Sequence, residues 1–261
     1  VESGIKYFLF GIISSAVMLF GFSLLYGFSG TTRIYAIQQE AATNQVPLAG
    51  LVVAVMMVLV GFGFKISAVP FHFWAPDVYE GSPTSIAGFL STVSKAAGFA
   101  VLMRVLLHVF GTAKGEIWMI LVAVMAAATM FVGNILAIPQ KNIKRMIAFS
   151  SIAQAGYILV GGATGTEFGF TSAVYYLMAY LVTNLAVFAI ISWVERSTGS
   201  SDIQAFAGLN RRAPGMTLLM MIALHSVGFL LSVVFLPRCW FLAPPLRMGS
   251  SGWRCWVSSI R

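Results

Sequence analysis

Two lysines of this sequence lie inside long apolar runs, where a lipid bilayer would make a charged amine costly. Lys65 lies within Leu51–Val69, and Lys95 lies within Ile86–Leu107. A charged side chain at the centre of a spanning helix costs roughly 2.5–3.5 kcal/mol on insertion scales. A chain that keeps two such groups is expected to use them. Because burial disfavours the charged form of an amine, we predict that these lysines carry a proton or another cation.

The composition of the chain indicates that these runs cross a membrane. Of its 261 residues 59% are hydrophobic and only 9% are charged, against about 25% charged in soluble domains. We expect an all-α, polytopic transmembrane helix bundle, because an open sheet cannot satisfy its edges in lipid. Seven apolar segments approach the roughly 20 residues that a spanning helix needs. They cover about residues 5–28, 47–69, 85–110, 117–138, 143–162, 170–194 and 214–236.

The net charge of +8 is typical of membrane topology rather than of nucleic-acid binding, because most basic residues lie in short loops between the apolar runs. Only Arg33 and Lys114 fall in the loops on one side of the membrane. The loops on the other side carry Lys141, Lys144, Arg145, Arg196, Arg211 and Arg212. The excess of positive charge predicts that this second side is cytoplasmic and that it also holds the N-terminus and the loop His72–Pro83.

The sequence leaves two interpretations of Lys65 open. Pro70 has no amide hydrogen and its ring clashes with the carbonyl of Ile66, so the helix should break beside Lys65. Broken backbone at membrane depth is tolerated only against a cavity or buried protein, so Lys65 beside freed carbonyls and Ser67 could hold a proton. The alternative is that Lys65, which lies toward one end of its helix, extends its amine to the interface.

Lys95 favours the functional interpretation, because it lies well inside its segment and its stem is too short to reach either interface comfortably. Ser91, Ser94 and two alanines flank it. Arg104 lies closer to the end of the same segment, and we interpret it as extending to the interface. We predict that Lys65 and Lys95 exchange protons when a neighbouring charge moves.

Further polar residues lie near the ends of the apolar runs. Glu2 and Lys6 are four residues apart, so they share a helix face and are expected to form an interfacial ion pair. The loop after Pro70 carries His72, Trp74, Asp77 and Glu80. His72 could titrate near neutral pH and pass protons to the bulk phase, or the aromatic residues could simply anchor this loop at the interface.

The remaining residues suggest no soluble chemistry. His108 and Asn134 are interpreted as structural polar groups, and a later polar stretch of Ser150, Ser151, Gln154 and Tyr157 could line water. The sequence has no glycine-rich phosphate loop, no Cys–His metal spacing and no nucleophile beside a base. Its two cysteines, Cys239 and Cys255, indicate neither a disulfide framework nor a metal site. We expect this chain to bind no cofactor, metal or nucleic acid.

Four stretches resemble the antiporter-like membrane subunits of respiratory complex I, and within them the subunit N type. They are Gly4–Phe8, Gly63–Pro83, Ser94–Lys95 and Gln140–Tyr157. The string Asp-Val-Tyr-Glu-Gly, residues 77–81, is similar to subunit N. The sister subunits and the related multi-subunit cation/proton antiporters usually carry an Ala-His type of sequence there. The resemblance covers most of residues 1–228.

This resemblance implies inverted repeats, broken helices and a line of buried lysines that carries protons. Lys65 matches the lysine of the first broken helix, Lys95 matches the central lysine of the next helix, and Lys6 matches a further lysine of the line. The resemblance therefore favours a role for Lys6 in the proton path over a role in an interfacial ion pair alone. The complex would use NADH, flavin, iron–sulfur clusters and quinone outside this chain. Its antiporter-like and quinone-site membrane subunits would be the partners, in the lipid bilayer of a bacterial plasma membrane.

The chain departs from the family at both ends. The family's pairing glutamate would lie upstream of Val1, so we expect a truncated N-terminus. After Gly228 the family continues with a Gly-Ile-Pro-Pro turn and a helix that carries a lysine, whereas this chain has an Arg/Cys/Trp-rich tail. One restored base would recover the family's string and place its lysine at Arg238, so we predict a frameshift. The expected domains are a partial proton-translocating domain, residues 1–228, and an aberrant tail, residues 229–261.

The predicted function is that of a membrane subunit of a proton-pumping NADH:quinone oxidoreductase that performs no redox step itself. Lys65, Lys95 and Lys6 would translocate protons, and His72 is a further candidate for proton exit. The alternatives are a subunit of a multi-subunit cation/proton antiporter and a purely structural membrane subunit.

Overall fold

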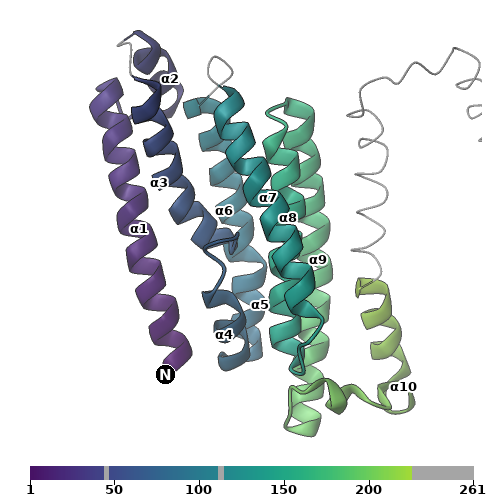
Figure 1. The fold of residues 1–261 in the computed structure, drawn as a ribbon. Helices are drawn as coiled ribbons and strands as arrows, with labels where there is room; N and C mark the ends of the chain where they lie inside the picture. Colours follow the sequence, from purple (N-terminus) through teal and green to yellow (C-terminus); the bar gives the residue numbers. More distant parts are fainter. Residues whose placement is uncertain (44–46, 111–114, 225–261) are drawn as a thin grey trace, which may run out of the picture.

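Long helices side by side make up the protein (Figure 1). The computed structural model describes residues 1–43, 47–110 and 115–224. The main helices are α1 (Glu2–Ser29), α3 (Leu48–Ile66), α6 (Val93–Val105), α7 (Gly115–Ala137), α8 (Ile143–Ala163) and α9 (Glu167–Thr198). Shorter elements are α2 (Ile34–Thr43), α4 (Trp74–Gly81), α5 (Thr84–Ser91), the π-helix η1 (Leu106–Phe110), the 3-10 helix η2 (Ile203–Phe206) and α10 (Leu209–Arg212).

Six predicted spanning segments are confirmed by length and composition, and the described residues contain no strand. The six spans are Glu2–Ser29, Ala49–Ile66, Thr84–Val109, Trp118–Ala137, Ile143–Ala163 and Glu167–Thr198. Of the seventh predicted segment, the structure describes an apolar helix over Pro214–Leu224. The remainder of that segment, the predicted frameshift after Gly228 and the tail 229–261 lie outside the described residues, so these predictions stay open.

Small residues let the central helices approach closely. A Cβ atom at Gly133 of α7 would lie 2.5 Å from the amide nitrogen of Ala153 in α8. One at Gly156 of α8 would lie 2.8 Å from the amide nitrogen of Met130 in α7. Because lipid is as apolar as a helix surface, such close van der Waals packing holds spanning helices together. The α7–α8 pair therefore forms a tight unit within the bundle.

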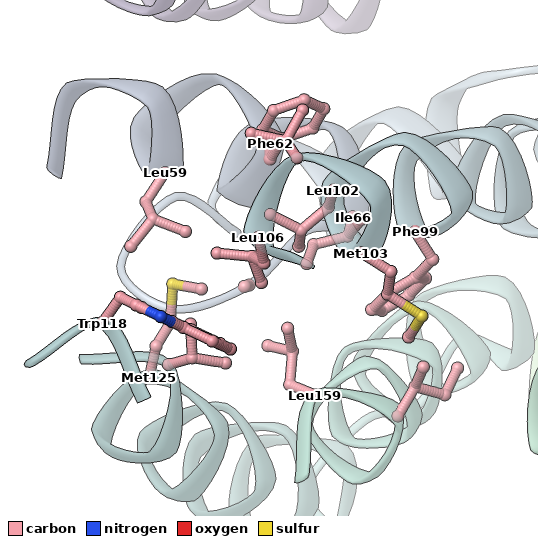
Figure 2. Packing of buried hydrophobic residues seen from close by; sticks show 14 of the residues in the cluster. Leu59, Phe62, Ile66, Phe99, Leu102, Met103, Leu106, Trp118, Met125 and Leu159 are labelled. Atoms are coloured by element: carbon pink, nitrogen blue, oxygen red, sulfur yellow. The ribbon is translucent and has the colours of Figure 1, made fainter. Parts of the chain in front are cut away.

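A buried apolar cluster has members in all six spanning segments, and Figure 2 shows part of it. Its members include Leu59, Phe62 and Ile66 of α3, Phe99, Leu102 and Met103 of α6, Leu106 of η1, Trp118 and Met125 of α7, and Leu159 of α8. These contacts fix α6 against its neighbours. The backbone that carries Lys95 is therefore held by packing on several sides.

The backbone departs from helical geometry at two places, after Lys65 and before Lys95. The predicted break after Lys65 is confirmed, because α3 ends at Ile66 and Ser67 is left-handed, with φ 60°. The second interruption was not predicted, since residues 85–110 read as one segment. Thr92, with φ −111° and ψ −85°, separates α5 from α6 three residues before Lys95. Both lysines therefore lie next to non-helical backbone.

The basic loops gather at one end of the bundle, as the charge pattern predicts. The N-terminus, α4, the α7–α8 connection and α10 lie together at that end, whereas α2 lies at the opposite end (Figure 1). At the α2 end, Arg104 of α6 is exposed and donates a hydrogen bond to the hydroxyl of Tyr35, at 2.7 Å. Which end faces the cytoplasm remains a prediction.

Candidate functional site

Lys95 is the most deeply buried charged residue of the described chain, with only 1% of its surface exposed. Its Nζ donates to two oxygen atoms of Ser151 in α8, the carbonyl at 3.0 Å and the hydroxyl Oγ at 2.9 Å. The Ser151 hydroxyl in turn donates to the carbonyl of Ala148, at 2.8 Å. No described carboxylate forms an ion pair with Lys95. Among the described residues, neutral oxygen atoms alone therefore bind this amine.

Lys65 lies against the same helix. A Cβ atom at Gly98 of α6 would lie 3.0 Å from Cγ of Lys65, so the stem of the lysine crosses α6 at a glycine. Gly98 follows Lys95 by three residues, which places both on one helix face. Lys65 is half-buried, and its amine has no hydrogen bond or ion pair with the described residues. The structure thus brings Lys65 and Lys95 to one junction of α3 and α6.

Hydrogen bonds to α3 and α7 hold the unwound backbone after α3, and α4 binds the end of α3 itself. The amides of Ser67 and Ala68 donate to the last carbonyls of α3, and the amide of Val69 donates to Oγ1 of Thr129 in α7, at 3.0 Å. Trp74 donates its ring Nε1 to the carbonyl of Phe64, at 3.0 Å, and only 2% of its surface is exposed. The prediction of an interfacial loop is therefore wrong in part. The centre of this stretch is the helix α4, and Trp74 is buried and hydrogen-bonded to the broken helix.

Lys6 belongs to a network of charges at the α4 end of the bundle. The predicted pair with Glu2 is present at 2.7 Å, and Lys6 also binds Asp77 of α4, again at 2.7 Å. Arg145 at the start of α8 binds Asp77 and Glu80, both at 2.8 Å. Burial of Asp77 opposes its charge, but the hydrogen bond from Lys6 and the charge of Arg145 outweigh it and lower its pKa. Among the described residues, Lys6 forms its hydrogen bonds and ion pairs within this network and not with Lys65 or Lys95.

Comparison with known proteins assigns this arrangement to a family. The family described as NADH:quinone oxidoreductase/Mrp antiporter, TM, matches residues 1–248. The chain belongs to this family. NADH-quinone oxidoreductase subunit N of Heliobacterium modesticaldum is 48% identical over 227 residues, which are 87% of this chain and 47% of that protein.

Two solved structures share the fold of this chain. A chain of respiratory complex I from Thermus thermophilus matches with a TM-score of 0.72 and 34% identity, over 87% of this chain and 48% of that one. A chain of the Mrp complex from Dietzia sp. DQ12-45-1b matches with a TM-score of 0.76 over 90% of this chain and 46% of that one. At 22% identity the second match shows the fold alone. The chain spans about half the length of the curated relatives that it matches.

In this member of the NADH:quinone oxidoreductase/Mrp antiporter family, a second ion pair ties three helices together, and the sequence did not indicate it. Lys144 of α8, only 5% exposed, binds Glu195 of α9 at 3.0 Å and the carbonyl of Ser82 at 3.3 Å. Glu195 also accepts a hydrogen bond from the hydroxyl of Thr84, the first residue of α5. Thr84 begins the segment that leads to Lys95, so this pair fixes its entry into the bundle.

His72 lies between the broken helix and α4, and it is buried rather than open to the bulk phase, with 5% of its surface exposed. Its ring nitrogen Nδ1 has no hydrogen-bond partner among the described residues, and the same holds for Oγ of Ser67 and Oη of Tyr79. Buried polar groups in native proteins generally find a partner or an ordered water. Three such atoms at and after the break that follows α3 are consistent with ordered water in that part of the bundle.

Acidification is expected to destabilise the protein through His72. Burial lowers the pKa of this imidazole, and a backbone hydrogen bond with Pro70 opposes the shift only in part. The unfolded chain, with a pKa near 6.5, therefore binds a proton first as the pH falls. Stability is retained above about pH 6.5 and decreases below it. His72→Asn should flatten the dependence of the thermal unfolding midpoint on pH in this range, and an unchanged slope would contradict the assignment.

Proposed function

We propose that this chain is part of a subunit N of a proton-pumping NADH:quinone oxidoreductase and that Lys95 carries protons through it. The observation that carries the proposal is the burial of the Lys95 amine in a spanning bundle, where its hydrogen bonds within the described chain go to neutral oxygen atoms of Ser151. Intramembrane ionisable residues without a structural counter-charge generally mark an ion or proton pathway. An approaching charge can change the protonation of such an amine at small cost.

Lys65 is proposed as the partner of Lys95 in this transfer. Its stem lies against Gly98 on the face that carries Lys95, and its amine lacks a recorded partner in the described chain. A proton that arrives on Lys65 would repel a proton on Lys95, because two like charges in a low-dielectric site disfavour one another. This repulsion offers a physical route for stepwise movement between the two lysines.

Lys6 and His72 are proposed for the end of the path near α4. Lys6 bonds to Asp77, which also binds Arg145, so the protonation of Lys6 would be felt through the whole network. Nδ1 of the buried His72 imidazole has no hydrogen-bond partner within the described part of the chain, so it could receive a proton through ordered water. We propose that this end of the bundle, which the loop charges predict to be cytoplasmic, is where the path exchanges protons with the bulk phase.

The chain is a multi-pass protein of the bacterial plasma membrane. We propose that its partners are the other antiporter-like and quinone-site membrane subunits of the complex, together with the lipid bilayer. NADH oxidation, flavin, iron–sulfur clusters and quinone would belong to those other subunits. Quinone reduction in those subunits would be coupled to proton transfer in this chain through a change in the charge beside its lysines.

Inside-out vesicles with the complete complex should acidify their lumen when NADH and a quinone are supplied. Lys65→Ala in the full-length subunit should reduce this acidification by roughly tenfold or more, since a positioned acid–base group contributes at least that much. The control is Lys141→Ala, which removes an exposed lysine at the α4 end. Unchanged acidification in Lys65→Ala would contradict a role for Lys65, and proton release driven by sodium without NADH would favour the cation/proton antiporter instead.

A further inference from the structure

The interruption before Lys95 leaves a backbone carbonyl in the interior of the bundle. In an uninterrupted helix, the carbonyl of Ser91 would accept the amide of Lys95, four residues later. Here α5 ends at Ser91 and α6 begins at Val93. The carbonyl of Ser91 accepts a hydrogen bond from the hydroxyl of Tyr180 in α9, at 3.0 Å. The hydroxyl of Tyr180 thus takes the place of the Lys95 amide as the hydrogen-bond donor to this carbonyl.

The Tyr180 hydroxyl is itself oriented by a neighbour. Nδ2 of Asn184, one turn further along α9, donates to it at 2.8 Å. This leaves the hydroxyl hydrogen of Tyr180 for the carbonyl of Ser91, because a hydroxyl has a single hydrogen to donate. All three residues are buried, with exposures of 4% for Tyr180, 8% for Asn184 and 0% for Ser91. Water is thus largely excluded from this relay, and the hydrogen bonds have no nearby replacement.

We infer that Tyr180, oriented by Asn184, is a positioning residue that keeps the α5–α6 junction open and so holds the Lys95 amine on Ser151. The inference rests on the proposed proton path through Lys95. The amine of Lys95 is held by Ser151 of α8, and the junction before Lys95 is held by Tyr180 of α9 through the carbonyl of Ser91. If the hydroxyl is removed, the free carbonyl of Ser91 can take the Lys95 amide. The helix then rewinds, and the amine turns away from Ser151.

Other titratable groups lie near Tyr180 or near the helix face of Lys95, and none of them is hydrogen-bonded to Ser91 among the described residues. They are Lys65 on α3, Tyr79 on α4 and Tyr176 on α9. Tyr180 donates its hydroxyl to the carbonyl of Ser91. Tyr176 instead donates its hydroxyl to Gln154, one turn from Ser151 on α8. Tyr176 and Tyr180 therefore lie on the same helix face, are both buried and differ in what they bind, which supplies a matched control.

The test is Tyr180→Phe in the full-length subunit of the assembled complex, with NADH-driven proton uptake by vesicles measured against pH. Loss of the Ser151 hydrogen bonds removes what favours the charged form of the amine. The alkaline limb of the pumping profile should therefore move down by roughly 0.5–1 pH unit, the equivalent of one or two net hydrogen bonds. Asn184→Ala, which keeps the Tyr180 hydroxyl, should shift the limb in the same direction by less.

Tyr176→Phe is the control for a merely structural role, since it also removes a buried hydroxyl from α9. An unshifted profile in Tyr180→Phe, or an equal shift in Tyr176→Phe, would overturn the inference. Lys95→Ala is measured in parallel. If it leaves pumping intact, the proposed path fails, whereas lost pumping in Lys95→Ala with no shift in Tyr180→Phe refutes the positioning role alone.

Discussion

Lys95→Ala is expected to abolish proton pumping by the assembled complex, with a fall of roughly two orders of magnitude, the lower range for a positioned acid–base group. The amine is 1% exposed and is bound only by Ser151 among the described residues. A methyl group at this position cannot bind a proton, and no other amine of the described residues is bonded to Ser151. The reason for the loss is chemical and does not depend on the packing of the side chain.

Lys95→Met separates chemistry from packing, because methionine keeps an unbranched stem of similar volume without an amine. It should lose pumping as completely as Lys95→Ala, while the amount of assembled complex stays close to that of the unaltered protein. NADH-driven acidification of vesicles, normalised to assembled complex, is the measurement. Pumping that survives in either variant would remove Lys95 from the proton path.

Glu195→Ala is expected to have the largest effect on stability. It leaves Lys144, which is only 5% exposed, without its counter-charge and removes the hydrogen bond to Thr84. Breaking one partner of a buried ion pair costs about 3–5 kcal/mol, and the partial exposure of Glu195 places this case near 3 kcal/mol. We expect a lower midpoint of thermal unfolding and less of the subunit in the complex.

Glu80→Ala is the matched control for this prediction. Glu80 is 40% exposed at its side chain, and its partner Arg145 keeps a second carboxylate in Asp77. Exposed ion pairs contribute about 0–1 kcal/mol, so this variant should unfold within a few degrees of the unaltered protein. Equal destabilisation by Glu80→Ala and Glu195→Ala would show that the Lys144–Glu195 pair has no special role.

Local rules predicted the parts of this protein that depend on neighbouring residues. Runs of apolar residues indicated the spanning helices, and Pro70 predicted the break beside Lys65, because proline disrupts the turn that precedes it. The spacing of Glu2 and Lys6 predicted their pair, since four residues bring side chains together on one helix. The position of Lys95 in the middle of its run indicated that its amine is buried. The interruption of the same run at Thr92 was not predicted, because no proline or glycine stands at that position.

The tertiary structure alone decided which groups meet across helices. Ser151 lies 56 residues from Lys95, Glu195 lies 51 residues from Lys144, and Tyr180 lies 89 residues from Ser91. Such pairs depend on how helices dock and rotate against one another, and this is set by close packing at many small contacts rather than by local spacing. The amino-acid sequence by itself determined that amines are buried in a membrane. Only the packed bundle decided which oxygen atoms bind them.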